Sequence, residues 1–259
     1  MAESFRVLVV DIGSHVTRAG WSGDDAPNQT LPSPDGLLDD LDGPTAIETM
    51  QAVSTLMRFD WSAQRVVAVS HAGVSSLSLV TLFMHRLGVS AIHLVSQLEA
   101  GLAFCGRGAG IVVDCGKFST CCGAVCWDAG GLLTWTLSSK AVAADGVLLA
   151  ADLDQMVEKA YRRIDDPQFQ HDARAFVLLL GGRASAALAS ELTPIVSRGK
   201  SVVPMLKDPD TAWRGGSLLG GLESMQWLER HEVDGVFEED AREAGERRLR
   251  GIVQRYFRL

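Results

Sequence analysis

The sequence predicts an α/β protein with mixed sheets that contains a duplicated strand–turn–strand unit. Short apolar, β-branched runs alternate along the chain with longer segments of helical periodicity, which is the pattern of α/β folds. One motif, first seen near residue 11, recurs near residue 114. The 259 residues, 47% of them apolar, are enough to bury a core in one large domain or two modest lobes.

The elements follow from periodicity and from the residues that interrupt it. Strands are expected where short runs rich in Val, Ile and Leu end at Gly, Asp or Pro. They are residues 5–10, 16–21, 65–70, 91–95, 110–114, 121–127, 132–137, 175–180 and 202–206. Helices are expected where apolar residues recur every three or four positions, as Ala46, Met50 and Val53 do. They are residues 45–59, 76–87, 97–104, 152–164, 184–192, 215–230 and 238–259.

The recurring motif is an apolar strand that ends in Asp-x-Gly and is followed at once by a second extended segment. The first copy has Asp11 and Gly13 at its tip, and the second has Asp114 and Gly116. Glycine lets backbone N–H groups approach phosphate oxygens, Ser14 adds a donor, and an aspartate can hold Mg²⁺ through water. The repeat therefore indicates a nucleotide site. The structural alternative is that Asp-x-Gly only closes a hairpin.

Composition narrows the class of protein. The net charge of −8 argues against a general nucleic-acid or lipid-surface binder, and no apolar run reaches the about 20 residues that a membrane span needs. We expect a soluble, intracellular protein, because no basic and apolar signal segment is visible. The five cysteines, four of them within residues 115–126, invite a zinc interpretation, but paired CxxC spacing is missing. Buried free thiols on strands are the simpler interpretation.

Four blocks of this sequence resemble actin and the actin-related proteins, in the family's order. They are residues 9–27 with Ala-Gly-Trp-Ser-Gly-Asp-Asp-Ala-Pro, residues 97–116, residues 180–182, and residues 213–219 with Trp-Arg-Gly-Gly-Ser-Leu-Leu. The resemblance implies an actin-like (ribonuclease H-like, duplicated) ATPase fold, with two mixed-sheet lobes around an ATP cleft. Most of the outer subdomains are expected to be missing, because residues 35–43 replace one long insertion and the other is absent. The expected divisions are residues 1–138, with a second lobe starting near 110, then 139–237, and a C-terminal helix at 238–259.

The family's site residues carry over by position. Gln97 would orient the attacking water. The positions that would contact nucleotide are Asp11, Gly13, Ser14, Arg18, Asp114, Gly116, Lys117, Gly181 and Gly182. Asp11 and Asp114 would hold a metal only if nucleotide binds. Four departures argue against catalysis: His15 and Phe118 replace loop glycines, Lys117 replaces an acidic residue, and Cys121 replaces a histidine. We therefore expect Gln97 to be vestigial, no cofactor, and no significant hydrolysis; the alternative is ATP or ADP with Mg²⁺.

The function expected from the resemblance is that of a non-filament-forming scaffold subunit in a cytoskeletal, axonemal, dynein-associated or chromatin complex, in the cytoplasm or alternatively in the nucleus. The alternative is an ATP-binding switch with slow hydrolysis, and a third hypothesis is an actin regulator. Partners would be other protein subunits, including a helix inserted in the family's hydrophobic cleft, and actin. The matching cleft positions are Ala103, Gly106, Leu218, Leu219 and Leu222. The leucines could equally be ordinary core, and helix 238–259 could dock on the chain itself or on a partner.

Overall fold

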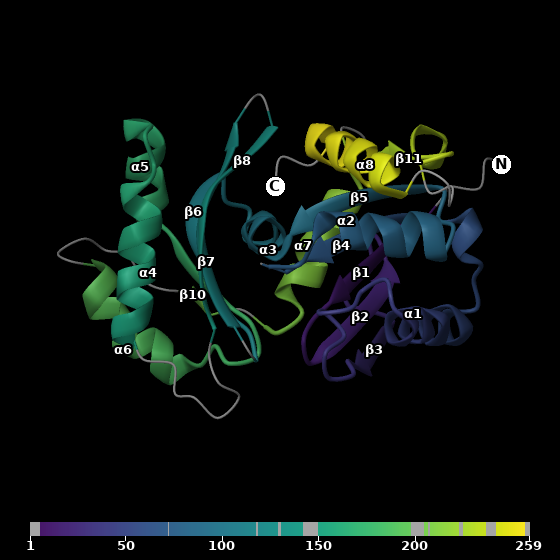
Figure 1. The fold of residues 1–259 in the computed structure, drawn as a ribbon. Coiled ribbons are helices and arrows are strands. Elements are labelled where there is room, and N and C mark those ends of the chain that lie inside the picture. Colours follow the sequence, from purple (N-terminus) through teal and green to yellow (C-terminus); the bar gives the residue numbers. More distant parts are fainter. Residues whose placement is uncertain are drawn as a thin grey trace. The chain divides into compact units, whose positions relative to one another are not determined.

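A computed structural model describes residues 6–71, 73–117, 119–128, 131–141, 150–197, 205–206, 208–222, 225–236 and 242–256. The chain forms two compact units, Met1–Val95 with Gly216–Leu259, and Ser96–Gly215. Each unit has a mixed sheet and helices (Figure 1), which confirms the predicted α/β class. The chain passes between the units after Val95 and after Gly215, and not at residues 138 and 237 as expected from the sequence. The first crossing lies at the end of β5 (Ala91–Ser96), and the second lies within helix α7 (Thr211–Gly220).

The first unit is built on a six-stranded sheet in the order β11-β5-β4-β1-β2-β3. Its strands are β1 Leu8–Ile12, β2 Val16–Trp21, β3 Gln29–Pro32, β4 Arg65–Ser70, β5 Ala91–Ser96 and β11 Leu228–Glu229. Strand β1 pairs antiparallel with β2 and parallel with β4, which places it in the middle of the sheet. All five residues of β1 are buried, as a central strand covered on both faces requires.

Helices cover both faces of this sheet. They are α1 Pro44–Met57, α2 Ser76–Val80 with a π-helical continuation Thr81–Arg86, α7 Thr211–Gly220 and α8 Arg242–Tyr256. Leu8 and Val10 belong to a core that also contains residues of α1, α2 and α8. Val9 points to the other face, where Gly216 of α7 lies so close that a Cβ atom there would come within 3.1 Å of Val9.

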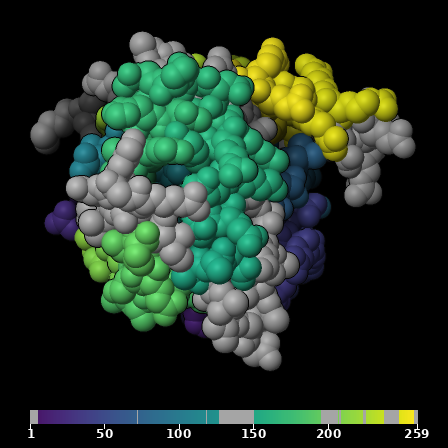
Figure 2. Space-filling model, turned by 90° about the vertical axis from the view of Figure 1, so that its left-hand side faces the viewer, coloured from purple at the N-terminus to yellow at the C-terminus, as the bar shows by residue number. Residues whose placement is uncertain are grey.

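The C-terminal helix packs on its own unit. Three apolar residues of α8, Leu249, Ile252 and Val253, are buried in the first unit's core, and α8 contacts α2. Their spacing of three and four residues is the predicted amphipathic pattern, and the helix is confirmed over Arg242–Tyr256. The opposite side of α8 lies on the surface (yellow in Figure 2).

The second unit is built on a five-stranded sheet in the order β10-β9-β6-β7-β8. Its strands are β6 Ala109–Cys115, β7 Ser119–Asp128, β8 Gly131–Ala141, β9 Val177–Leu180 and β10 Met205–Leu206. Its helices are α3 Gln97–Phe104, α4 Ala150–Arg162, α5 Pro167–Arg174 and α6 Ala186–Ser197. Ile111 and Val113 of β6 share a core with residues of α4, α5 and α6. Helix α3 lies on the other face, where Gly101 packs directly on Leu178 and Leu180.

The two sheets repeat one arrangement. In each, a hairpin (β1–β2 or β6–β7) is followed by an antiparallel third strand (β3 or β8), and a parallel strand (β4 or β9) lies beside the hairpin's first strand. The next strand along the chain, β5 or β10, lies outside that parallel strand. The order β5-β4-β1-β2-β3 therefore corresponds strand for strand to β10-β9-β6-β7-β8. The duplication seen in the sequence motif extends to the whole topology of each unit.

Three parts of the chain differ from the sequence prediction. Residues 215–230 do not form one helix, because α7 ends at Gly220 and β11 pairs antiparallel with β5. The edge strand β3 was not predicted, and neither was α5, although Asp166 caps α5 and Pro167 opens it. Predicted residues 202–204, 238–241 and 257–259 lie outside the described part of the chain. Among the described residues, no helix is both long and apolar enough to cross a membrane.

Candidate functional site

The first candidate half-site is the tip of hairpin β1–β2. The backbone N–H of Gly13 donates to the carbonyl of Val16 at 3.1 Å, which closes the turn. A Cβ atom on Gly13 would lie 2.7 Å from that carbonyl oxygen, so the tight turn requires glycine at this position. Ser14 lies in the turn with its side chain half-buried, and His15 is exposed beside it.

Asp11, just before this turn, has two basic side chains as partners, an arginine and a histidine. Its carboxyl group is 2% exposed; Oδ2 accepts a hydrogen bond from Arg18 at 3.3 Å, and Oδ1 lies 3.0 Å from Nε2 of His71. A carboxylate offers only acceptors, so Nε2 of His71 must carry the proton of this bond. Both carboxylate oxygens are therefore engaged by the first unit's own side chains.

Sheet register explains why these three residues meet. Arg18 is the direct neighbour of Asp11 in the antiparallel pair β1–β2, and Asp11 is level with Val69 in the parallel pair β1–β4. His71 follows β4 by one residue, so it lies at the carboxyl end of a strand adjacent to Asp11. His71 was not among the predicted site residues, although the placement of residues 65–70 beside the first strand would have located it.

The second candidate half-site is the tip of hairpin β6–β7, which repeats the first. Gly116 corresponds to Gly13: a Cβ atom there would lie 2.8 Å from the carbonyl oxygen of Ser119. Asp114, 6% exposed, accepts a hydrogen bond from the amide of Gln97 at 2.6 Å, and the same amide nitrogen lies 3.6 Å from the sulfur of Cys121. The structure thus brings together the predicted pair Gln97 and Asp114.

The position of Gln97 is set by the start of helix α3. Ser96 caps this helix: its side chain accepts from the N–H of Glu99 at 3.2 Å, and the Glu99 carboxylate accepts from the N–H of Ser96 at 2.8 Å. This capping box fixes the first turn and directs Gln97, the first helical residue, into the buried region beside Asp114.

The Gly181-Gly182 turn follows β9 and packs on the second tip. Gly181 has a φ of +89°, and a Cβ atom there would lie 2.5 Å from Oδ1 of Asp114. Gly182 is exposed, with no atom within 4 Å of where its Cβ would be. The next residue, Arg183, donates its backbone N–H to the carbonyl of Cys115 at 3.0 Å and a guanidinium N–H to the carbonyl of Lys117 at 3.4 Å. Arg183 therefore adds a second cationic residue to Lys117 at this tip.

The cysteines beside the second tip are buried thiols. Burial, and then the charge of Asp114, raise the pKa of Cys115 to about 12, and burial also raises the pKa of Cys122. Thiols held protonated in this way are poor metal ligands and nucleophiles. Within the described residues no group of three or more His, Cys, Asp or Glu side chains is arranged to hold a metal ion.

The predicted partner positions have different exposures. Leu218 and Leu222, at the end of α7 and just after it, are 55% and 48% exposed, whereas Leu219 between them is buried. Ala103 is half-buried near the end of α3, and Gly106 adopts a left-handed conformation, φ +62°, that terminates this helix. Leu219 is thus a core residue, and the leucines with exposed side chains are Leu218 and Leu222.

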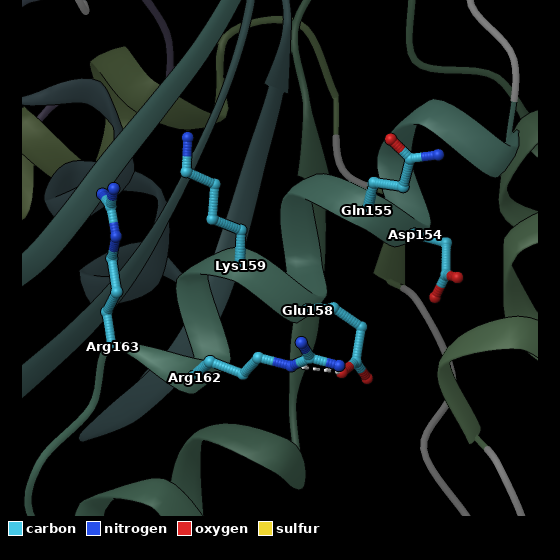
Figure 3. Close-up of a pocket in the computed structure, with 6 residues that line it drawn as sticks. All are labelled: Asp154, Gln155, Glu158, Lys159, Arg162 and Arg163. Carbon is cyan, nitrogen blue, oxygen red and sulfur yellow. Dashed lines mark ion pairs between the residues drawn. The ribbon is translucent and has the colours of Figure 1, made fainter.

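A cavity of about 490 Å³ lies along α4 (Figure 3). Its described lining residues are Asp154, Gln155, Glu158, Lys159, Arg162 and Arg163. All six side chains are polar, and Arg162 pairs with Glu158 at 3.6 Å. Small-molecule sites of this size usually have apolar walls with a few polar groups, so the described side chains of this cavity do not by themselves indicate such a site.

The sequence was compared with known proteins. No protein-family model matches this chain, and no curated protein matches it significantly.

Proposed function

We propose that this chain is a shortened member of the actin-like fold class that serves as a protein-binding scaffold subunit, with its nucleotide site no longer functional. The duplicated strand order supports the fold, because each unit has three antiparallel strands followed, after a helix, by a strand parallel to the first. This is the topology that the ribonuclease H-like lobes of the resemblance imply. In such a fold the residues that contact nucleotide lie at the two hairpin tips. The departures of this chain from the family pattern fall at the same tips.

The observation that carries the proposal is the state of Asp11. A magnesium ion binds a carboxylate directly or through its bound water, and each Asp11 oxygen keeps a lone pair beside the one that its hydrogen bond uses, so the charge around Asp11 decides whether the ion can bind. Here Arg18 and His71 engage both oxygens, and the guanidinium places a permanent positive charge beside the carboxylate. A second cation about 4 Å from that charge would be destabilised by on the order of 4 kcal/mol at a surface-like dielectric. Asp11 therefore acts as the centre of an ion cluster and not as a metal ligand.

The second tip supports the same conclusion. Asp114 is engaged by Gln97, so the amide that would have to orient a water molecule is used to satisfy a buried carboxylate. Lys117 and Arg183 add two cationic residues where the resemblance implies an acidic one near a metal. Without a metal to bridge phosphates, hydrolysis of a triphosphate loses its main source of charge stabilisation.

The alternative function, an ATP-binding switch, has one observation in its favour. Both tip glycines are sterically required, and Gln97 and Asp114 are held together at 2.6 Å, as a working site would need. Under our proposal the same features persist because they close the hairpins and satisfy a buried carboxylate.

Nucleotide binding separates the two functions. The full chain, purified without added nucleotide, should carry less than about 0.1 equivalent of adenine nucleotide, and millimolar Mg-ATP should not raise its unfolding temperature. His71→Ala, which releases one oxygen of Asp11, should increase Mg²⁺ binding over the native chain, and His231→Ala, an exposed histidine of the same unit, should not. A saturable, Mg²⁺-dependent stabilisation of the native chain would refute the proposal. If no such stabilisation is seen, purification of the native complex and identification of its partners would test whether the subunit belongs to a cytoskeletal or a chromatin assembly.

A further inference from the structure

The outward face of helix α8 is strongly basic. Its inward residues Leu249, Ile252 and Val253 are buried, and the remaining positions from 247 to 255 are exposed. The exposed residues are Arg247, Arg248, Arg250, Gly251, Gln254 and Arg255. At 100° per residue, the four arginines occupy a single arc of the helix surface. We call these four residues the arginine face; the atoms of α8 are yellow in Figure 2.

The arginine face contrasts with the rest of the protein. From 247 to 255 the helix has four arginines and no acidic residue, while the chain as a whole has a net charge of −8. On two other helices an arginine pairs with an acidic residue one turn away: Arg162 with Glu158, and Arg214 with Asp210 at 2.9 Å. On α8, Glu243 and Glu246 precede Arg247 and Arg250 by four residues in the sequence, whereas Arg248 has no acidic residue three or four positions away. The structure gives no ion pair to Arg247, Arg248 or Arg250 within its described residues. The side chains of these three arginines are exposed, so their guanidinium groups are accessible to a partner.

We propose that the arginine face binds a carboxylate-rich segment of a partner protein. The planar guanidinium matches a carboxylate with two parallel hydrogen bonds, and arginine is enriched at the energetic centres of protein interfaces. Helix α8 holds the four side chains on a rigid element whose other side is anchored in the first unit's core, so little ordering of the helix is needed on binding. An acidic peptide that follows the helix can contact several arginines at once.

Two other anionic partners fit the surface less well. A membrane-bound amphipathic helix inserts its apolar side into lipid, but the apolar residues of α8 are already buried in the protein core. A nucleic acid would bring a continuous line of phosphates close to a protein of net charge −8, which opposes binding beyond the one basic helix. A short acidic protein segment requires only the helix itself.

This inference names the chemistry of a partner and so rests on the proposed scaffold function. The test uses the full chain and a fluorescently labelled glutamate-rich peptide, with binding followed by anisotropy at 50 and 300 mM salt. The native chain should bind, and binding should weaken at high salt. The triple substitution Arg247→Gln, Arg248→Gln and Arg250→Gln should weaken binding about tenfold. The matched control neutralises three exposed cations at the end of α4 and just after it, Lys159→Gln, Arg162→Gln and Arg163→Gln, and should change affinity less than about twofold.

The triple Arg→Lys substitution at the same α8 positions keeps the charge and the helix propensity, so it tests the surface even if the Gln variant is less stable. It should retain salt-dependent binding, with an affinity between those of the native chain and the Gln variant. Equal loss in the α8 and α4 Gln variants would overturn the proposal, and so would tighter binding to phosphatidylserine vesicles or double-stranded DNA than to the peptide. Nucleotide content, measured on the same preparations, reports separately on the proposed function.

Discussion

Replacing Gly215 by alanine would place a methyl group against the backbone of helix α3. The added Cβ would lie 1.7 Å from the carbonyl oxygen of Ala100 and 2.3 Å from its carbonyl carbon. Non-bonded carbon contacts have their optimum at about 3.5–4.0 Å, so α7 and α3 would have to separate by about 2 Å at this point. The clash is with main-chain atoms of a helix, which cannot move aside as a side chain would.

The expected cost follows from this geometry. Overpacking of a well-filled core costs about 1–3 kcal/mol, and a collision with backbone belongs at the upper end of that range. Alanine has a higher helix propensity than glycine, and this difference offsets about 1 kcal/mol of the cost. We therefore expect Gly215→Ala to lower the free energy of unfolding by about 2 kcal/mol or more.

Gly251 provides the matched control. It also lies inside a helix, but it is exposed and nothing lies within 4 Å of an added Cβ. Here the propensity gain acts alone, and Gly251→Ala should stabilise the protein by about 0.5–1 kcal/mol. Urea denaturation followed by circular dichroism measures both changes. If both substitutions stabilised the chain, or both left it unchanged, the close packing of α7 on α3 would be wrong.

Three further predictions test other contacts. Asp11→Asn should destabilise the protein by about 1–3 kcal/mol in urea denaturation, because one cationic partner loses its acceptor at a buried position; an unchanged midpoint would contradict the ion cluster. Tyr256→Phe removes the hydrogen bond that lowers the pKa of Glu232, so it should cost less than about 1 kcal/mol at pH 7. Because folding lowers the pKa of Glu232 below its ordinary value of 4.5, the ionised carboxylate stabilises the fold at pH values above 4.5. The cost of Tyr256→Phe should therefore disappear as the pH falls through the folded-state pKa. At pH 8, iodoacetamide should alkylate half-buried Cys126 in the native protein and Cys115 only after unfolding, as mass spectrometry would show.

Periodicity predicted the long elements because burial of one face dictates their sequence. Residues 45–59 became α1 within two residues at each end, and the strands of both hairpins formed where β-branched runs end at Asp-x-Gly. The failures have local causes. Leu218, Leu219 and Leu222 have helical spacing, but the helix ends at Gly220, and Leu228 and Glu229 further on pair with β5 as a strand. Strand β3 has four residues and ends in proline, which only an edge strand tolerates, so it left little pattern to detect.

The candidate site was predictable within each hairpin but not between strands. The motif located Asp11 and Asp114, and register then fixed Arg18 opposite Asp11. The contact with His71 depends on the parallel alignment of β1 with β4, two strands separated by more than fifty residues, and such non-local pairing is invisible to local periodicity. The state of Asp11, on which the proposed function depends, therefore required the structure.

The duplication also shows where the two tips differ. Asp11 is level with Val69 of β4, and Asp114 is level with Leu180 of β9, so His71 and Gly182 occupy equivalent positions two residues further on. At the second tip this position is an exposed glycine that leaves the end of the strand open. At the first tip the same position is filled by an imidazole bonded to the aspartate. At the first tip His71 thus gives Asp11 a second partner beside Arg18, while glycine at the equivalent position of the second tip has no side chain to do so, which makes His71 the most informative residue to change under our proposal.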